Sequence, residues 1–336
     1  MNKPVSYFVG GILVGALIAS AGFSLSQYAQ KGSGGDLKVL KLGHGLNTEH
    51  PVHKAMEFMK TRLEELSDGS LTIDIYACSV LGSENQCIEM LQNESLDMAK
   101  ASAATMENFV PEISVFGLPY IFRDADHYWN VLNGSIGKRL LEAGESKFLY
   151  GLCYYDAGSR NFYTKDKPVR TPDDLLGMKI RVMSSPTAIA MVEAMGASPT
   201  AIDWGELYSA LQQGTADGAE NNPPSFTSSK HYEVCKHFTL DAHTRIPDML
   251  IISTKTWKKL NRNERKWIQQ AADESSVFQR QLWQEETVKA LELAKAEGVE
   301  IYEVDTEAFA AKVAPMLEEV KDRNVRALLK EISEVE

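Results

Sequence analysis

The 336-residue sequence contains only four cysteines, Cys78, Cys87, Cys153 and Cys235, and none of them forms a C-x-x-C pair. This scarcity excludes a cysteine-based zinc site or a dithiol redox centre as the basis of function. We expect single buried thiols, because a large domain folds without cross-links even in an oxidising compartment. A bridge between Cys78 and Cys87 is the alternative.

Sequence signatures of common enzymes are also missing: there is no G-x-S-x-G, no H-E-x-x-H and no P-loop. Residues 135–138 fit S-x-x-K, but the companion S-D-N and K-T-G elements are absent, so the match is a coincidence. His44, Glu49, His50 and His53 could be drawn as metal ligands. A lone H-x-x-H is better explained by a loop that enters a helix. The sequence predicts no catalysis, no cofactor and no metal centre.

Basic residues are outnumbered, with 35 Lys and Arg against 46 Asp and Glu, for a net charge of −11. The charges are interspersed rather than collected in basic blocks, which excludes nucleic acid as a partner. An anionic ligand would gain no long-range attraction from such a protein.

The N-terminus has the layout of an export signal. Lys3 precedes an uncharged apolar run at 7–23, and small residues at 19–21 provide a cleavage site. We expect residues 1–35 to be a signal peptide and linker, which places the mature protein in the periplasm. No cysteine lies in this stretch, so a lipoprotein anchor is excluded. The apolar run is also borderline in length for a membrane span, so an uncleaved anchor is the alternative.

The remaining chain alternates between strand and helix patterns. Residues 37–42 and 71–76 alternate like strands, 51–66 and 84–91 carry apolar residues at helical spacing, and 96–101 is again extended. This order favours a mostly parallel sheet between layers of helices. The chain is longer than one core usually organises, so we expect two domains.

The middle of the chain has clear helix boundaries around the strand 179–183. Thr171 caps a helix before this strand, Ser185 starts one after it, and Asp203 opens a third that Gly214 ends. Helix starts that follow strand ends form crevices where unpaired N–H groups meet anions. Farther on, 262–297 predicts one long helix able to brace two lobes, followed by a strand at 299–304 and one amphipathic helix from 306 onward.

Several polar or aromatic side chains fall at these predicted strand and helix ends. Arg160 and Arg181 could each grip a carboxylate, because a guanidinium donates two parallel hydrogen bonds and stays charged. Asn221 lies in a rigid turn and offers a donor and an acceptor, while Trp204 can stack on a ligand or pack in the core. Taken singly, each residue also has an ordinary structural explanation.

A series of motifs resembles the DctP-type substrate-binding proteins of TRAP (tripartite ATP-independent periplasmic) transporters. The motifs are KIRV at 179–182, GASPT at 196–200, ELY at 206–208, DGAEN at 217–221 and FGLPY at 116–120. The resemblance implies a protein that performs no chemistry, captures an organic acid as a monomer, and delivers it to small and large integral membrane subunits.

The family fold is a two-lobed α/β periplasmic binding protein, in which each lobe is a mixed sheet flanked by helices and a long helix braces both. The resemblance implies an N-terminal lobe at 36–155 that is completed by parts of 245–336. It further implies a C-terminal lobe at 156–244 and a long helix at 262–297.

The resemblance also assigns ligand contacts. Arg181 matches the carboxylate-clamping Arg of the family, Arg160 a second basic contact and Asn221 a ligand-contacting Asn. Trp204 falls where an aromatic residue often lines the cleft. Ser102 occupies a position that is acidic in sialic-acid-binding members, which argues against that ligand.

Lys100, Asp156 and His50 lie on segments that border the family's cleft, and we expect them as further contacts. The segments 156–160 and 220–225 resemble those of members that bind hexuronates such as glucuronate or galacturonate. A C4-dicarboxylate or another sugar acid is the alternative, since Lys100 could hold a second carboxylate. A membrane-tethered ligand sensor and a secreted enzyme acting on acidic sugars are further alternatives.

Overall fold

Two β-sheets organise residues 37–336, the part of the chain that the computed structural model describes. The predicted signal peptide, its anchor alternative and the linker at 1–35 lie outside these residues. One sheet consists of β1 (Lys38–Gly43), β2 (Leu71–Tyr76), β3 (Met98–Ser102), β4 (Leu149–Tyr155) and β10 (Asp248–Ser253). The other consists of β5 (Asn161–Thr164), β6 (Lys179–Val182), β7 (Ser198–Ala201), β8 (Gly218–Asn221), β9 (His237–Leu240) and β11 (Glu300–Glu303). We call the two sheets with their helices the N-terminal lobe and the C-terminal lobe.

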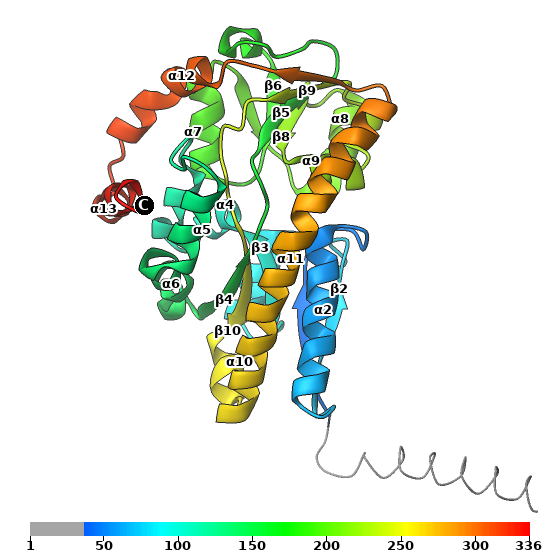
Figure 1. Cartoon of the computed structure of the whole chain (residues 1–336), viewed down its shortest axis with the longest axis vertical. Helices are drawn as coiled ribbons and strands as arrows, with labels where there is room; N and C mark the ends of the chain where they lie inside the picture. The colour runs from blue at the N-terminus through cyan, green and yellow to red at the C-terminus, as the bar shows by residue number, and fades with distance from the viewer. Residues whose placement is uncertain (1–36) are drawn as a thin grey trace, which may run out of the picture. The chain divides into compact units, whose positions relative to one another are not determined.

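Both sheets are mixed, as the resemblance implies. Their strand orders are β2-β1-β3-β10-β4 and β11-β9-β5-β8-β6-β7 (Figure 1). β1 runs parallel to β3, and β6 runs parallel to both β7 and β8. β10 is antiparallel to β3 and β4, because it enters the first sheet on its return from the C-terminal lobe. The mostly parallel sheet expected from strand and helix order is therefore wrong.

Helices cover both faces of each sheet, and their apolar residues form the cores. The N-terminal lobe has α2 (Pro51–Leu66), α3 (Glu84–Gln92), α4 (Ala103–Met106), α5 (Ala125–Asn133), α6 (Ser135–Glu142), α10 (Thr254–Lys259) and α13 (Arg323–Ser333). The C-terminal lobe has α7 (Pro186–Ala194), α8 (Trp204–Gln213), α9 (Pro223–Ser228) and α12 (Thr306–Glu318). Short 3-10 helices occur at Pro111–Gly117, Glu145–Lys147, Pro172–Leu175 and His231–Glu233.

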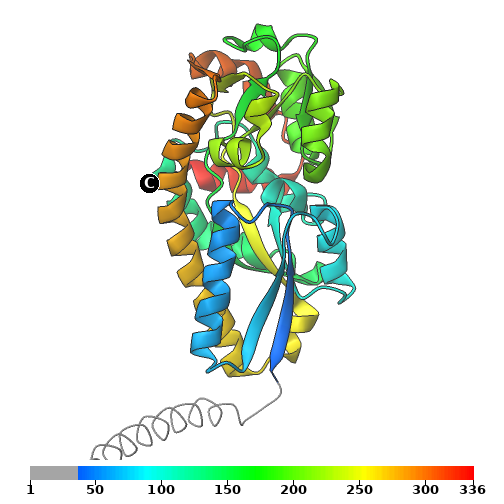
Figure 2. The ribbon, with the colours of Figure 1, turned by 90° about the vertical axis from the view of Figure 1, so that its right-hand side faces the viewer.

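The predicted long helix is confirmed as α11 (Arg262–Ala296). Asn261 caps it by accepting hydrogen bonds from the backbone N–H groups of Asn263 and Glu264. The helix packs along α2, where Phe58 and Phe278 stack with 4.6 Å between their ring centroids, and continues to the C-terminal lobe (Figure 2). Within the described residues, no helix is both long enough and apolar enough to cross a membrane.

Two other expectations need correction. The single terminal helix is wrong, because the chain breaks after α12 and Asp322 caps α13 as a separate helix. α12 buries Phe309 in the C-terminal lobe, whereas α13 buries Ile332 in the N-terminal lobe. All four cysteines are free thiols, so the Cys78–Cys87 bridge is not formed, and Cys78 is exposed rather than buried.

The segments that cross between the lobes are held against each other and against α11. The Arg160 N–H donates to the Thr244 carbonyl at 2.8 Å, which joins the two crossing segments. The Gln279 amide accepts from the Asp156 N–H at 2.7 Å and donates to the Asp156 carbonyl at 2.8 Å. Gly158 follows with a φ of +57°, and a Cβ there would lie 2.8 Å from the indole nitrogen of Trp283. Because that ring belongs to α11, the crossing segment has no room for a side chain.

We expect the Gly158→Ala variant to lose about 2 to 4 kcal/mol of unfolding free energy, from left-handed strain and a clash with Trp283. Gly177→Ala is the matched control, because Gly177 has a φ of +76° but open space around its Cβ position. That control is expected to lose only about 1 kcal/mol. Urea unfolding followed by circular dichroism measures both. Equal losses in the two variants would show that the packing against α11 is loose.

Candidate ligand-binding pocket

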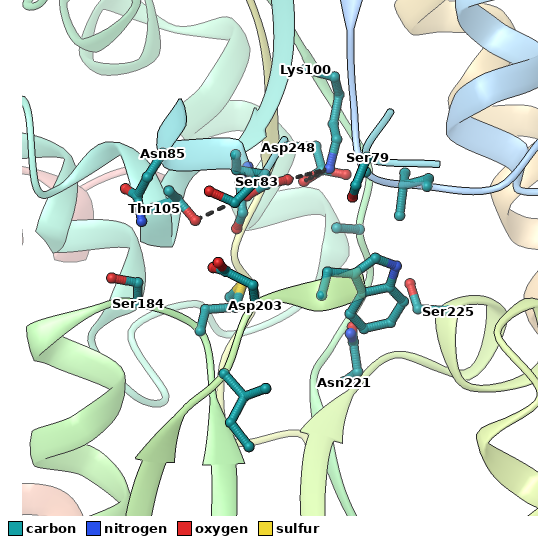
Figure 3. A pocket seen from close by; sticks show the side chains of 18 of the residues that line it. Ser79, Ser83, Asn85, Lys100, Thr105, Ser184, Asp203, Asn221, Ser225 and Asp248 are labelled. Atoms are coloured by element: carbon teal, nitrogen blue, oxygen red, sulfur yellow. Dashed lines mark hydrogen bonds and ion pairs between the residues drawn. The ribbon is translucent and has the colours of Figure 1, made fainter. Parts of the chain in front are cut away.

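A pocket of about 730 Å³, open mouth included, lies between the two lobes. The carboxyl ends of β3, β6 and β8 meet at it, as expected for ligand crevices of α/β sheets (Figure 3). Its N-terminal-lobe wall is formed by Gly45, Leu46, Ser79, Ser83, Glu84, Asn85, Lys100, Ser102, Thr105 and Asp248. The opposite wall is formed by Ala157, Arg160, Arg181, Met183, Ser184, Ile202, Asp203, Trp204, Asn221, Asn222 and Ser225. Five of the seven predicted contacts therefore line one cavity.

Arg181 is a buried cation with no counterion among residues 37–336. Its side chain projects from β6, the residue is 1% exposed, and Nε donates to the Ile202 carbonyl at 2.8 Å. Nη1 is buried without a hydrogen-bond partner, and no carboxylate of the described residues lies within ion-pair distance of the guanidinium. Burial lowers the pKa of Arg181, yet an Arg side chain stays charged in proteins. An unpaired buried charge is costly, so this wall favours an anionic ligand.

Arg160 is buried too, but its charge is matched. Its guanidinium forms a two-point ion pair with Glu220, which also lies 3.4 Å from His243 Nε2. His243 Nδ1 in turn lies 2.7 Å from the Asp241 carboxylate. Burial opposes protonation of His243, but the Asp241 and Glu220 carboxylates outweigh it and raise its pKa to about 9. Burial likewise favours protonated Glu220, but Arg160 and His243 prevail and lower its pKa to about 2. The charge of Arg160 is therefore balanced within the protein by Glu220.

Asn221 and Trp204 flank the two arginines. The Asn221 Oδ1 atom accepts from Arg160 Nη1 at 3.1 Å and from the Asn222 N–H at 2.8 Å. The Nδ2 group of Asn221 therefore remains to donate to a ligand. The Trp204 ring lines the cavity, lies 5.7 Å from the Arg181 guanidinium carbon and also packs against two core clusters. Trp204 thus serves the core and the cavity wall together.

Lys100 belongs to a triad of charges on the opposite wall. Its Nζ lies 2.7 Å from a Glu84 oxygen and 3.3 Å from an Asp248 oxygen (Figure 3). Burial would lower the pKa of Lys100, but the two carboxylates raise it above its usual value. The other Glu84 oxygen accepts from the Ser102 N–H at 3.1 Å and from the Thr105 hydroxyl at 2.9 Å. The charge of Lys100 is therefore already compensated by Glu84 and Asp248.

His50 and Asp156 lie behind the lining, so the structure does not place them as direct contacts. His50 caps α2 by accepting from the Val52 N–H, and its Nε2 lies 3.1 Å from the hydroxyl of the lining residue Ser225. Asp156 accepts from the Gly158 N–H at 2.8 Å and steadies the crossing segment. The helix start at Pro51 is confirmed.

The polar residues that sequence reasoning missed are mostly hydroxyls, amides and acids. They are Ser79, Ser83, Glu84, Asn85, Thr105, Ser184, Ser225 and Asp248. Ser83 begins a helix with a capping box, a pattern that the sequence does contain. Ser79 lies in a loop with a φ of +56° and carries no such pattern. Asp203 was expected to cap α8, but its side chain makes no capping bond and faces the cavity instead (Figure 3).

The sequence and structure match one group of known proteins. A family model described as bacterial extracellular solute-binding protein, family 7, matches residues 42–324. The chain is 31% identical over 318 residues to the C4-dicarboxylate-binding periplasmic protein DctP of Rhodobacter capsulatus, with 93% of each chain covered.

Two solved TRAP periplasmic solute-binding proteins have the same fold. One, from Citrobacter koseri with bound D-glucuronate, is 37% identical with a TM-score of 0.85, covering 89% of this chain and 100% of that one. Another, from a Bradyrhizobium species in complex with α/β-D-galacturonate, is 35% identical with a TM-score of 0.86, covering 88% and 99%.

Proposed function

Because the chain belongs to the bacterial extracellular solute-binding proteins of family 7, we propose that its pocket captures a hexuronate for a TRAP transporter. The ligand would be D-glucuronate or D-galacturonate, which two solved relatives hold. The observation that carries the proposal is Arg181, a buried cation that has no counterion among the described residues, in a cavity that also presents hydroxyl and amide groups. Such a cavity can bind a ligand that carries one carboxylate and several hydroxyl groups.

The walls favour a uronate over a C4-dicarboxylate. The sugar carboxylate would accept hydrogen bonds from the guanidinium of Arg181 and from the Nδ2 group of Asn221, whose Oδ1 atom is already bound to Arg160. A second carboxylate would face the opposite wall, where Lys100 is already paired with Glu84 and Asp248. Lys100 is therefore a poor second clamp, and the dicarboxylate alternative loses its supporting residue.

Hydrogen bonds across the cleft support capture by closure of the lobes. The Glu107 carboxylate of the N-terminal lobe accepts from the Ser185 hydroxyl at 2.6 Å and from the Thr187 N–H at 2.9 Å, at the start of α7. Near the other end of the pocket, the Asn47 amide donates to the Ser228 carbonyl at 2.7 Å. Closure shields the ligand from water and strengthens its charge-assisted bonds. The loaded protein would then dock in the periplasm on the small and large membrane subunits and perform no chemistry itself.

A thermal-shift panel tests this function. We expect D-glucuronate or D-galacturonate, at about 100 times its dissociation constant, to stabilise the purified protein by about 2.7 kcal/mol. D-glucose, which has the ring without the acid, is the control and should give no shift. A response confined to succinate and malate would contradict the uronate assignment. Turnover of a bound uronate would contradict the transport role.

A further inference from the structure

The two walls of the pocket differ in their ability to bind an anion, because their charged side chains are paired differently. The C-terminal-lobe wall holds the uncompensated cation Arg181. On the N-terminal-lobe wall, Lys100 faces one carboxylate on each side, so the Glu84–Lys100–Asp248 triad has no spare positive charge. Figure 3 shows Lys100 and Asp248 across the cavity from Asn221. A ligand that spans the cavity therefore meets an uncompensated cation at one end only.

We propose that the Glu84–Lys100–Asp248 triad is a specificity determinant, which rejects ligands that carry a second carboxylate at the end remote from Arg181. This inference rests on the proposed function, in which Arg181 takes the first carboxylate. The three side chains are 18%, 3% and 10% exposed, so solvent does not screen their charges.

The triad excludes a carboxylate for two physical reasons. A carboxylate that enters this wall loses its hydration, and Lys100 cannot compensate it without giving up Glu84 or Asp248. An ionised Glu84 also repels it, since burial alone would raise the pKa of Glu84 but Lys100 and the Ser102 N–H lower it. Burial raises the pKa of Asp248, so the triad carries a net charge between zero and −1. In either protonation state of Asp248, the wall offers no uncompensated cation.

Neutral hydroxyl groups meet no such penalty. Ser79, Ser83, Asn85 and Thr105 line the same wall and supply donors and acceptors (Figure 3). A hydroxyl can donate to a carboxylate oxygen of the triad and accept from a neighbouring amide or hydroxyl. The pocket is thus polar at both ends but accepts charge at one end only.

The open-chain pair D-gluconate and D-glucarate isolates this effect, because glucarate differs from gluconate only by a carboxylate in place of the terminal CH₂OH group. Calorimetric titration of the wild-type protein should give a dissociation constant for glucarate at least about tenfold higher than for gluconate. In the Glu84→Gln variant the ratio should fall at least about threefold, because one negative charge is gone while the side chain keeps its size and shape. Glu89→Gln, on the exposed face of the same helix, should keep the wild-type ratio.

The ratio is measured within one protein, so it does not depend on the fraction of each variant that is folded. If Glu84→Gln does not fold, Asp248→Asn removes the other carboxylate of the triad and should move the ratio in the same direction. Equal affinities of the wild-type protein for gluconate and glucarate would overturn the proposal, as would a ratio that neither variant lowers. D-glucuronate is titrated in parallel. A protein that binds neither glucuronate nor gluconate contradicts the proposed function itself, whereas one that binds glucuronate but does not distinguish the pair contradicts only the triad.

Discussion

Replacing Arg181 with methionine is expected to weaken hexuronate binding at least about 100-fold, because two charge-assisted hydrogen bonds are lost and each contributes about 1.5 to 3 kcal/mol. The ligand-free variant should gain about 1 kcal/mol of stability, since the cation is buried with an unpaired Nη1. Opposite signs for affinity and stability are typical of a residue that is kept for its ligand. Isothermal titration and urea unfolding measure the two quantities.

Two further variants separate charge from geometry at this site. Arg181→Lys keeps the charge but loses the planar fork, and should cost about 1.5 to 3 kcal/mol of affinity. Arg170→Met removes an exposed arginine of the same lobe outside the pocket and should leave affinity unchanged. Wild-type affinity in either Arg181 variant would remove this residue from the binding site.

The sequence predicts the parts of the pocket that depend on local rules. Pro51 and Ser185 mark helix starts that the structure confirms, because capping and proline placement act over a few neighbouring residues. The motifs around Arg181 and Asn221 lead to strand ends, and the fold brings both to one cavity. Local pattern and family resemblance together were sufficient there.

The state of the charges could not be predicted in this way. Lys100 looks like a free clamp in the sequence, and only the return of β10 brings Asp248 beside it. Likewise Arg160 looks equivalent to Arg181, but Glu220, 60 residues later, neutralises it. Such pairings depend on strand register, and a shift by one residue would turn the side chains to the opposite face. The distinction between an arginine that is paired within the protein and one that is left unpaired therefore needs the tertiary structure.

The buried ion pair between Arg160 and Glu220 should contribute strongly to the stability of the fold. Glu220→Gln should lower the free energy of unfolding by about 3 to 5 kcal/mol, because it leaves Arg160 without its buried carboxylate and removes one of the two acids beside His243. Glu206→Gln, on an exposed position of the same lobe, should change stability by no more than about 0.5 kcal/mol. Urea unfolding at pH 7 compares the two variants.

The same network predicts how stability depends on pH. The pKa of His243 is raised from 6.5 to about 9 in the folded protein. Its contribution is therefore fully present below pH 6.5 and is lost as the pH rises through 9. Glu220→Gln removes one of the carboxylates that raise this pKa, so the variant should lose less stability between pH 6.5 and 9 than the wild type does. Parallel pH profiles in the two proteins would show that Glu220 does not hold the proton on His243.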